Sequence, residues 1–164
     1  MRQFVILVLA ATIVGCPARE SSDSPEQLAD ALIAAVKQKD AAQFKRLIHP
    51  ACMEGLSEPE RKYLELAVQN SLKEQIPEER TVRVFEVKNW SPPSDANAWR
   101  WPVKPTHQIE IAASTGEYSS VSICQYIAKQ GDRWLVVMPI PDPKTLEELE
   151  RQSAPRQPDG TRPR

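Results

Sequence analysis

Apolar residues recur every three or four positions through much of the first half of the chain, and this period predicts amphipathic helices. The first predicted helix presents Leu28, Leu32 and Val36 on one face and ends near Lys39. Residues 24–27 mark its start, because they supply a capping serine, a proline suited to the first helical position and a glutamine that can complete a capping box.

Two further helices are predicted from the same period. Asp40 can cap a short helix that ends before Pro50, since the residue before a proline leaves helical space. Its buried side is predicted to consist of Phe44, Leu47 and Ile48. A third helix follows a cap at Ser57 and runs to about Gln75. Its inward-facing residues are predicted to be Leu64, Ala67, Val68 and Leu72.

The second half of the chain changes to a period of two, which is typical of strands. Strands are predicted at residues 82–87, 108–113, 119–128 and 133–138. The last two form the clearest hairpin, because residues 130–132 read Gln-Gly-Asp and favour a turn. Asp142 can then cap a short polar helix over residues 143–151.

Helices followed by antiparallel strands indicate an α+β fold. We expect N-terminal helices packed on one face of a curved antiparallel sheet of about four strands. The pattern fits a single domain over residues 24–151. Residues 152–164 are rich in proline and arginine, and we expect them to form a disordered tail.

The stretch ALIAAVKQKDAAQFKRLIHP, residues 31–50, resembles the opening of NTF2-like proteins, and the hairpin that ends at residues 134–137 fits their final strands. The resemblance implies a cone-shaped fold with a pocket between the helices and the concave sheet. Some members of that superfamily are isomerases or dehydratases with Asp and His in the pocket. Many others are binding or assembly modules. The long third helix and the proline-rich residues 91–105 depart from the family pattern.

The chain begins with an apolar run, residues 4–14, behind a single cation at Arg2. A membrane-spanning helix needs about 20 apolar residues, so this run has the length of a signal-peptide core instead. It ends in Ile-Val-Gly-Cys at residues 13–16, which resembles the lipobox of bacterial lipoproteins. The resemblance implies a lipoprotein signal peptide over residues 1–15 and an acylated Cys16. The alternatives are an ordinary secretory signal and a buried N-terminal strand.

An acylated Cys16 would anchor the protein in the lipid bilayer of the bacterial cell envelope. Residues 16–23 would then form a polar tether with a reach of about 25 Å. Asp directly after the cysteine often signals retention at the inner membrane in Gram-negative lipoproteins, and this chain has Pro17 there. The sequence therefore favours the outer membrane, facing the periplasm, if the source is Gram-negative.

Composition excludes several classes of partner. The chain has 21 Lys and Arg against 22 Asp and Glu, so no strong field would recruit nucleic acid or an anionic surface. It contains no glycine-rich phosphate loop and no Gly-x-Ser-x-Gly elbow. With two histidines and no cysteine spacing typical of a metal site, no metal and no cofactor are predicted.

Cys52 and Cys124 are the cysteines that follow Cys16. In an oxidising periplasm they can form a disulfide, and closing so long a loop would contribute about 4 kcal/mol in the chain-entropy model. The alternative is two separate buried thiols that pack as small apolar side chains.

The two histidines suggest structural roles. His49 lies at a predicted helix end, where a cation complements the helix dipole and can bond the terminal carbonyls. His107 precedes a strand and is expected in a loop or at a sheet edge. An acid–base pair of Asp40 and His49 would require Asp40 to be free of its capping role.

Trp90, Trp99 and Trp101 are the candidate contacts for a ligand or partner, because they cluster among prolines around residues 94–97. Exposed aromatic rings on a stiff loop can stack on sugars, contact a partner or touch a membrane interface. In the alternative interpretation, Trp99 and Trp101 start a strand and cover the core.

Two functional hypotheses follow. The first is a non-enzymatic binding or assembly module of the cell envelope, which binds an envelope protein or a small ligand. The second is an NTF2-like pocket enzyme of the isomerase or dehydratase type, with Asp40 or His49 in the cavity. Two ionisable groups converging in an enclosed pocket would favour the enzyme, and an open apolar groove rimmed by Trp99 and Trp101 would favour the binder. A structural envelope component without a ligand is a third possibility.

Overall fold

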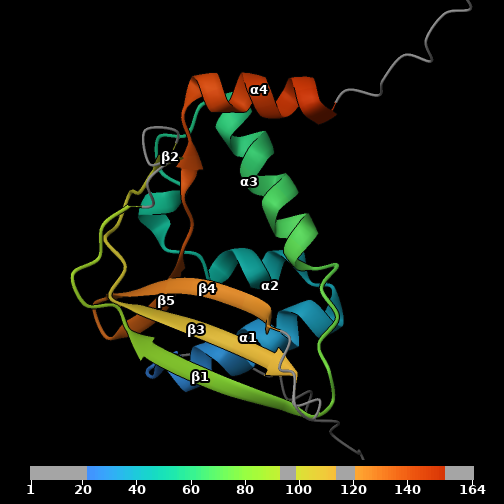
Figure 1. Ribbon diagram of the computed structural model, residues 1–164, viewed down its shortest axis with the longest axis vertical. Helices are drawn as coiled ribbons and strands as arrows, with labels where there is room; N and C mark the ends of the chain where they lie inside the picture. Colours follow the sequence, from blue (N-terminus) through green and yellow to red (C-terminus); the bar gives the residue numbers. More distant parts are fainter. Residues whose placement is uncertain (1–21, 93–98, 114–120, 154–164) are drawn as a thin grey trace, which may run out of the picture.

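The computed structural model describes residues 22–92, 99–113 and 121–153 (Figure 1). Its helices are α1 (Pro25–Gln38), α2 (Ala41–Arg46), the short 3-10 helix η1 (Pro50–Cys52), α3 (Glu58–Ser71) and α4 (Pro143–Ser153). Its strands are β1 (Arg80–Glu86), β2 (Trp99–Arg100), β3 (His107–Ala113), β4 (Val121–Gln130), β5 (Arg133–Val137) and β6 (Ile140–Pro141). The predicted signal peptide, Cys16 and residues 154–164 of the predicted tail lie outside the described residues.

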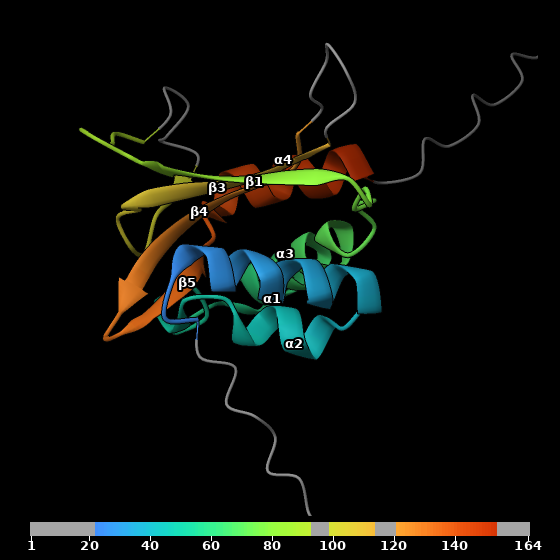
Figure 2. The same ribbon diagram turned by 90° about the horizontal axis from the view of Figure 1, so that it is seen from below.

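Four antiparallel strands form the main sheet in the order β1-β3-β4-β5. Figure 2 shows the sheet bending over α1, with α2 next to α1 on the same side. The predicted α+β class and the antiparallel sheet of four strands are therefore confirmed. In the described part of the chain, α1 to α3 precede the sheet and α4 follows it, so the helices are not confined to the N-terminal half.

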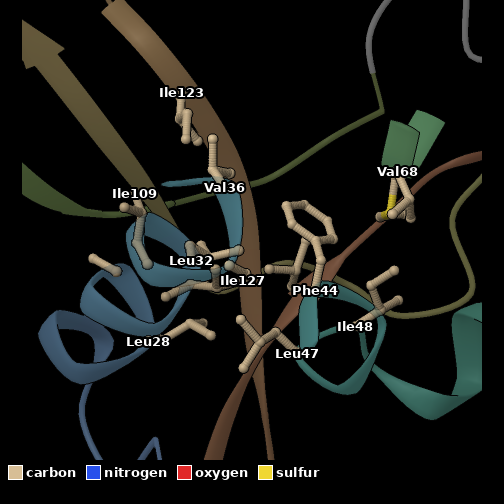
Figure 3. Close-up of a cluster of buried hydrophobic side chains, with 14 of the residues drawn as sticks. Leu28, Leu32, Val36, Phe44, Leu47, Ile48, Val68, Ile109, Ile123 and Ile127 are labelled. Atoms are coloured by element: carbon tan, nitrogen blue, oxygen red, sulfur yellow. The ribbon is translucent and has the colours of Figure 1, made fainter. Parts of the chain in front are cut away.

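The core lies between α1, α2 and the inner face of the sheet (Figure 3). Leu28, Leu32 and Val36 are fully buried, as the helical period predicts. Opposite them, Ile109 and Ile127 on neighbouring strands are also fully buried. Burying a side chain of this size completely contributes about 1.5–3 kcal/mol, so this layer supplies most of the force that holds the helices on the sheet.

The predicted helix starts are confirmed, with two corrections. The side chains of Ser24, Asp40 and Ser57 each accept a hydrogen bond from a backbone N–H of the following helix. The carboxamide of Gln27 accepts from Asp23 N at 2.8 Å rather than from the capping serine, so α1 has no true capping box. The third helix ends at Ser71, four residues before the predicted end, and the last turn is closed by Leu72.

The edge of β5 is covered by two segments from the first half of the chain. Ser22 Oγ donates to Trp134 O at 2.6 Å, and Trp134 N donates to Ser22 O at 2.8 Å. Two residues further along, Val136 N donates to Leu47 O and His49 N donates to Val136 O, both at 2.8 Å. Ser22 therefore belongs to the folded body, and the tether predicted over residues 16–23 ends earlier than expected.

A second, two-stranded sheet was not predicted. β2 pairs with β6 through Trp99 opposite Pro141 and Arg100 opposite Ile140. The guanidinium of Arg100 bonds the carboxylate of Glu60 on α3 at 2.9 Å, which ties this small sheet to the start of α3. Figure 1 shows α4, β2 and β6 together at the end of the molecule away from β1, with α3 running from that end towards α2.

Candidate functional site

A hollow of about 230 Å³ opens between α2, the last turn of α3 and β4. It is lined by Phe44, Asn70, Ser71, Glu74, Ile123, Cys124 and Gln125. Small-molecule sites usually enclose about 300–1,000 Å³, so this hollow is smaller than an ordinary ligand pocket. Its volume suits a single amino-acid side chain or a group of similar size.

The hollow has an apolar floor and a polar rim. Phe44 is 1 % exposed and Ile123 is 5 % exposed, so the floor belongs to the core. On the rim, the amide oxygen of Asn70 accepts from Lys73 Nζ at 3.0 Å. The carboxylate of Glu74 is exposed and forms no ion pair with any described residue. The site therefore combines apolar contact area with an exposed carboxylate that forms no ion pair among the described residues, and the ammonium of Lys73 lies at the same rim.

The two thiols are free, so the possible disulfide between Cys52 and Cys124 is not formed in the structure. Cys52 is fully buried beside the Met138 backbone, and burial raises the pKa of its thiol. Cys124 is exposed at the hollow, where its sulfur accepts from Gln108 Nε2 at 2.8 Å. The alternative of two buried thiols therefore holds for Cys52 alone.

His49 is structural, but in a different way from the one predicted. Its Nδ1 accepts from Ala51 N at 3.2 Å, so the ring caps the start of η1 instead of bonding the end of α2. The side chain is 8 % exposed. Burial lowers the pKa of His49, and the charge of Glu54 opposes this shift only in part. His49 therefore acts as a neutral acceptor, and the expected cation at a helix end is wrong.

A pH dependence of stability follows from His49. The unfolded chain takes up a proton near the ordinary pKa of 6.5, whereas the folded chain takes it up only at lower pH. Between these two pKa values the unfolded state binds more protons than the folded state. We therefore expect the free energy of unfolding to fall as the pH decreases from 7 through 6.5 and below. Urea unfolding of His49→Asn, which keeps a capping acceptor without a titration, should show a flatter pH profile. His49→Ala should be equally flat but less stable at pH 7 by about 1 kcal/mol; an unchanged slope in both variants would contradict this.

The acid–base pair considered for Asp40 and His49 is not assembled. Asp40 Oδ1 accepts from Gln43 N at 2.9 Å and so performs its predicted capping role. Neither Asp40 nor His49 lines the hollow.

His107 occupies an inner strand, not a loop or an edge. It is the first residue of β3, which lies between β1 and β4. Its ring contacts Trp134 edge to face at 4.7 Å, and its Nδ1 lies 3.2 Å from Thr106 Oγ1. Pro105 suggested a loop at this position, but the paired residues of β3 begin only two residues later, at His107.

The tryptophans of the proline-rich stretch are half-buried and packed against other rings. Trp99 contacts Tyr63 of α3 at 5.8 Å between ring centres. Trp101 lies 5.1 Å from Trp90 and 5.3 Å from Tyr126, both edge to face. Trp99 starts the short strand β2, and Trp101 packs against the core, as the second interpretation of this stretch stated. The open groove rimmed by Trp99 and Trp101, expected of a binder, is not where the hollow lies.

Within the described ranges, no group of three or more His, Cys, Asp or Glu side chains could hold a metal ion. None of the described helices is long and apolar enough to cross a bilayer. Comparison of the chain with protein-family models, with curated proteins and with solved structures finds no match.

Sequence analysis did not single out the hollow. Phe44 was predicted as core, and the polar rim was not predicted as a site at all. Glu74 reaches the rim because α3 ends at Ser71, so that the chain turns there instead of continuing as a helix. An early end to the helix was signalled weakly, since residues 73–75 contain no apolar side chain.

Proposed function

We propose that the protein is a membrane-anchored bacterial lipoprotein that serves as a binding or assembly module of the cell envelope. Residues 13–16 support the anchor, because they read as a lipobox ending in Cys16. The hydrogen bonds of Ser22 are consistent with it, since the folded body begins six residues after Cys16. In a Gram-negative source, the body would face the periplasm from the outer membrane.

The observation that carries the binding role is the hollow with the exposed carboxylate of Glu74, which forms no ion pair among the described residues. An apolar floor next to a carboxylate suits a lysine or arginine side chain, because such a side chain lays its aliphatic stem on apolar surface and keeps its charged head at the rim. We propose that the occupant is a basic side chain of an envelope protein. A volume of about 230 Å³ favours a side chain over a larger small-molecule ligand.

We retain an NTF2-like cone as a proposal for the fold family. The curved sheet over α1 and the helix–cap–helix order of α1 and α2 support it. The paired strands β2 and β6 and the position of α3 beside them depart from the family pattern described above. The enzyme alternative receives no support from Asp40 or His49, since both side chains accept backbone hydrogen bonds at helix starts.

Photo-crosslinking in living cells tests the proposed occupant. A photoreactive amino acid replaces Gln69, which is exposed on α3 close to the hollow and does not line it. We expect it to capture one envelope protein. Adding Glu74→Gln should lower the capture about fivefold, which corresponds to about 1 kcal/mol of binding free energy.

Glu79→Gln is the matched control, because Glu79 is an exposed acidic residue outside the hollow. We expect it to leave the capture unchanged. Peptide mapping should place the crosslink next to a lysine or arginine of the partner. Equal capture in both variants, or a crosslinked segment without a basic residue, would refute the proposed occupant.

A further inference from the structure

Ser22 and a few residues around it mark one end of the molecule. Ser22 is bonded to Trp134 on the edge of β5, and it is only 2 % exposed. The ring of Trp134 contacts His107 at 4.7 Å, and Lys129 Nζ lies 5.4 Å from the centre of the same ring. Arg133, at the turn between β4 and β5, is exposed. We call these five residues the hairpin end.

The chain between Cys16 and the hairpin end is short. Five residues lie between Cys16 and Ser22, so the six steps from one Cα atom to the next span at most about 21 Å. Because Ser22 is fixed by two hydrogen bonds, this limit applies to the folded body itself. A longer, free tether would have allowed any face of the protein to approach the membrane.

We propose, on the basis of the acylated Cys16 put forward above, that the protein stands on the membrane with its hairpin end at the lipid headgroups. Trp134 and Lys129 suit that position, since an amphipathic ring and a long cationic side chain both tolerate a boundary between water and lipid. The tether determines this orientation and the surface charge does not. Lys129 and Arg133 are offset in part by the exposed Asp132, which leaves a local excess of a single positive charge.

The opposite end of the molecule then points away from the membrane. Figure 1 shows β2, β6 and α4 at the far end from the start of α1. Lys129 pairs with Trp134, and Cys124 at the hollow lies five residues back along β4, a distance of about 17 Å. The hollow therefore lies away from the residues that we place at the headgroups, and we expect it to be accessible to a partner from the aqueous side.

The four tryptophans allow this orientation to be measured on the lipidated protein. The protein is labelled with 5-fluorotryptophan and placed in liposomes that contain a gadolinium-chelating lipid. Each fluorine signal is assigned by a single Trp→Phe substitution. We expect the paramagnetic relaxation of Trp134 to exceed that of Trp99 severalfold, with the same order in zwitterionic and anionic liposomes. Equal enhancement, or a larger value at Trp99, would overturn the proposed orientation.

A spacer variant tests whether the tether sets the orientation. Insertion of a flexible Gly/Ser segment of about 40 residues before Ser22 adds a typical span of about 35 Å. We expect the enhancement at Trp134 to fall towards that at Trp99. An unchanged excess at Trp134 would overturn the role of the tether, because the hairpin end would then bind the membrane by itself.

The test separates a wrong orientation from a wrong anchor. The mass of the mature N-terminus shows independently whether Cys16 carries acyl chains. If it carries none, the proposed anchor fails, and the orientation is then measured on residues 16–164 coupled through Cys16 to a maleimide lipid. The Cys124→Ser variant is used for this coupling, since Cys124 is exposed and Cys52 is fully buried. The relaxation order of Trp134 and Trp99 decides the orientation in either case.

Discussion

Exchange of residues 1–16 for a secretory leader that is cleaved before Pro17 is expected to release the protein from the membrane, if Cys16 carries the proposed acyl chains. One acyl chain alone binds a bilayer only marginally, with about 0.8 kcal/mol per buried methylene, whereas two or three chains give durable anchoring. No described helix is long and apolar enough to cross the bilayer in their place. We therefore expect the membrane-bound fraction to fall from nearly all to nearly none. Carbonate-washed membranes, probed with an antibody to the folded domain, provide the measurement.

Cys16→Ser within the native leader separates lipidation from secretion. The apolar run of residues 4–14 is too short to span a bilayer, so we expect a retained leader to hold the protein less firmly than acyl chains do. Cys124→Ser is the matched control, because it removes an exposed thiol without touching the leader. Full release by carbonate of the wild-type protein, or a mature N-terminus without diacylglycerol, would contradict the lipoprotein assignment.

The sequence predicted the features that depend on local chemistry. Helix starts at Ser24, Asp40 and Ser57 could be identified because a capping side chain acts within three residues of its own position. The buried faces of α1 and β3 followed from their periods of four and two. The turn at Gly131 followed as well, since its φ of +60° is a conformation that glycine adopts without strain.

The sequence did not predict features that depend on contacts between distant segments. β2 and β6 have two residues each, too few for a period of two to be recognised in the sequence. They form because the two residues of β2 pair with residues of β6 some forty positions later in the chain. His49 was misassigned for a related reason. The role of His49 is set by η1, which follows it in the chain, and by the Val136 carbonyl on β5. The preceding helix α2 does not contribute to that role.

The hollow is a further product of long-range contacts. Its floor combines Phe44 from α2 with Ile123 from β4, and its rim includes Glu74, which follows α3. Each of these residues has an ordinary local explanation as core or solvated surface. Only the packing of three separate elements places beside an apolar floor a carboxylate that no described cation pairs with. No local sequence pattern indicates that arrangement.

Phe44→Ala is expected to cause a large loss of stability among substitutions in the core, because Phe44 joins the core to the hollow. It is 1 % exposed and lies in the same cluster as Leu47, Ile48 and Ile127 (Figure 3). Truncation of a buried phenylalanine usually costs about 3–5 kcal/mol. We expect a value of about 3 kcal/mol, at the low end, because the space left behind opens into the hollow and can admit water. Against a typical domain stability of about 5–15 kcal/mol, this loss is a substantial fraction.

Urea unfolding at constant m-value measures this loss, and two variants bracket it. Phe44→Leu keeps most of the apolar volume and should cost less than about 1.5 kcal/mol. Phe85→Ala is the surface control, because Phe85 is 44 % exposed on β1 and should cost less than about 1 kcal/mol. If Phe44→Ala costs no more than Phe85→Ala, Phe44 does not hold α2 to the sheet. The floor of the hollow would then have to be formed by other side chains, and a basic side chain of a partner would lack the apolar surface on which we place its stem.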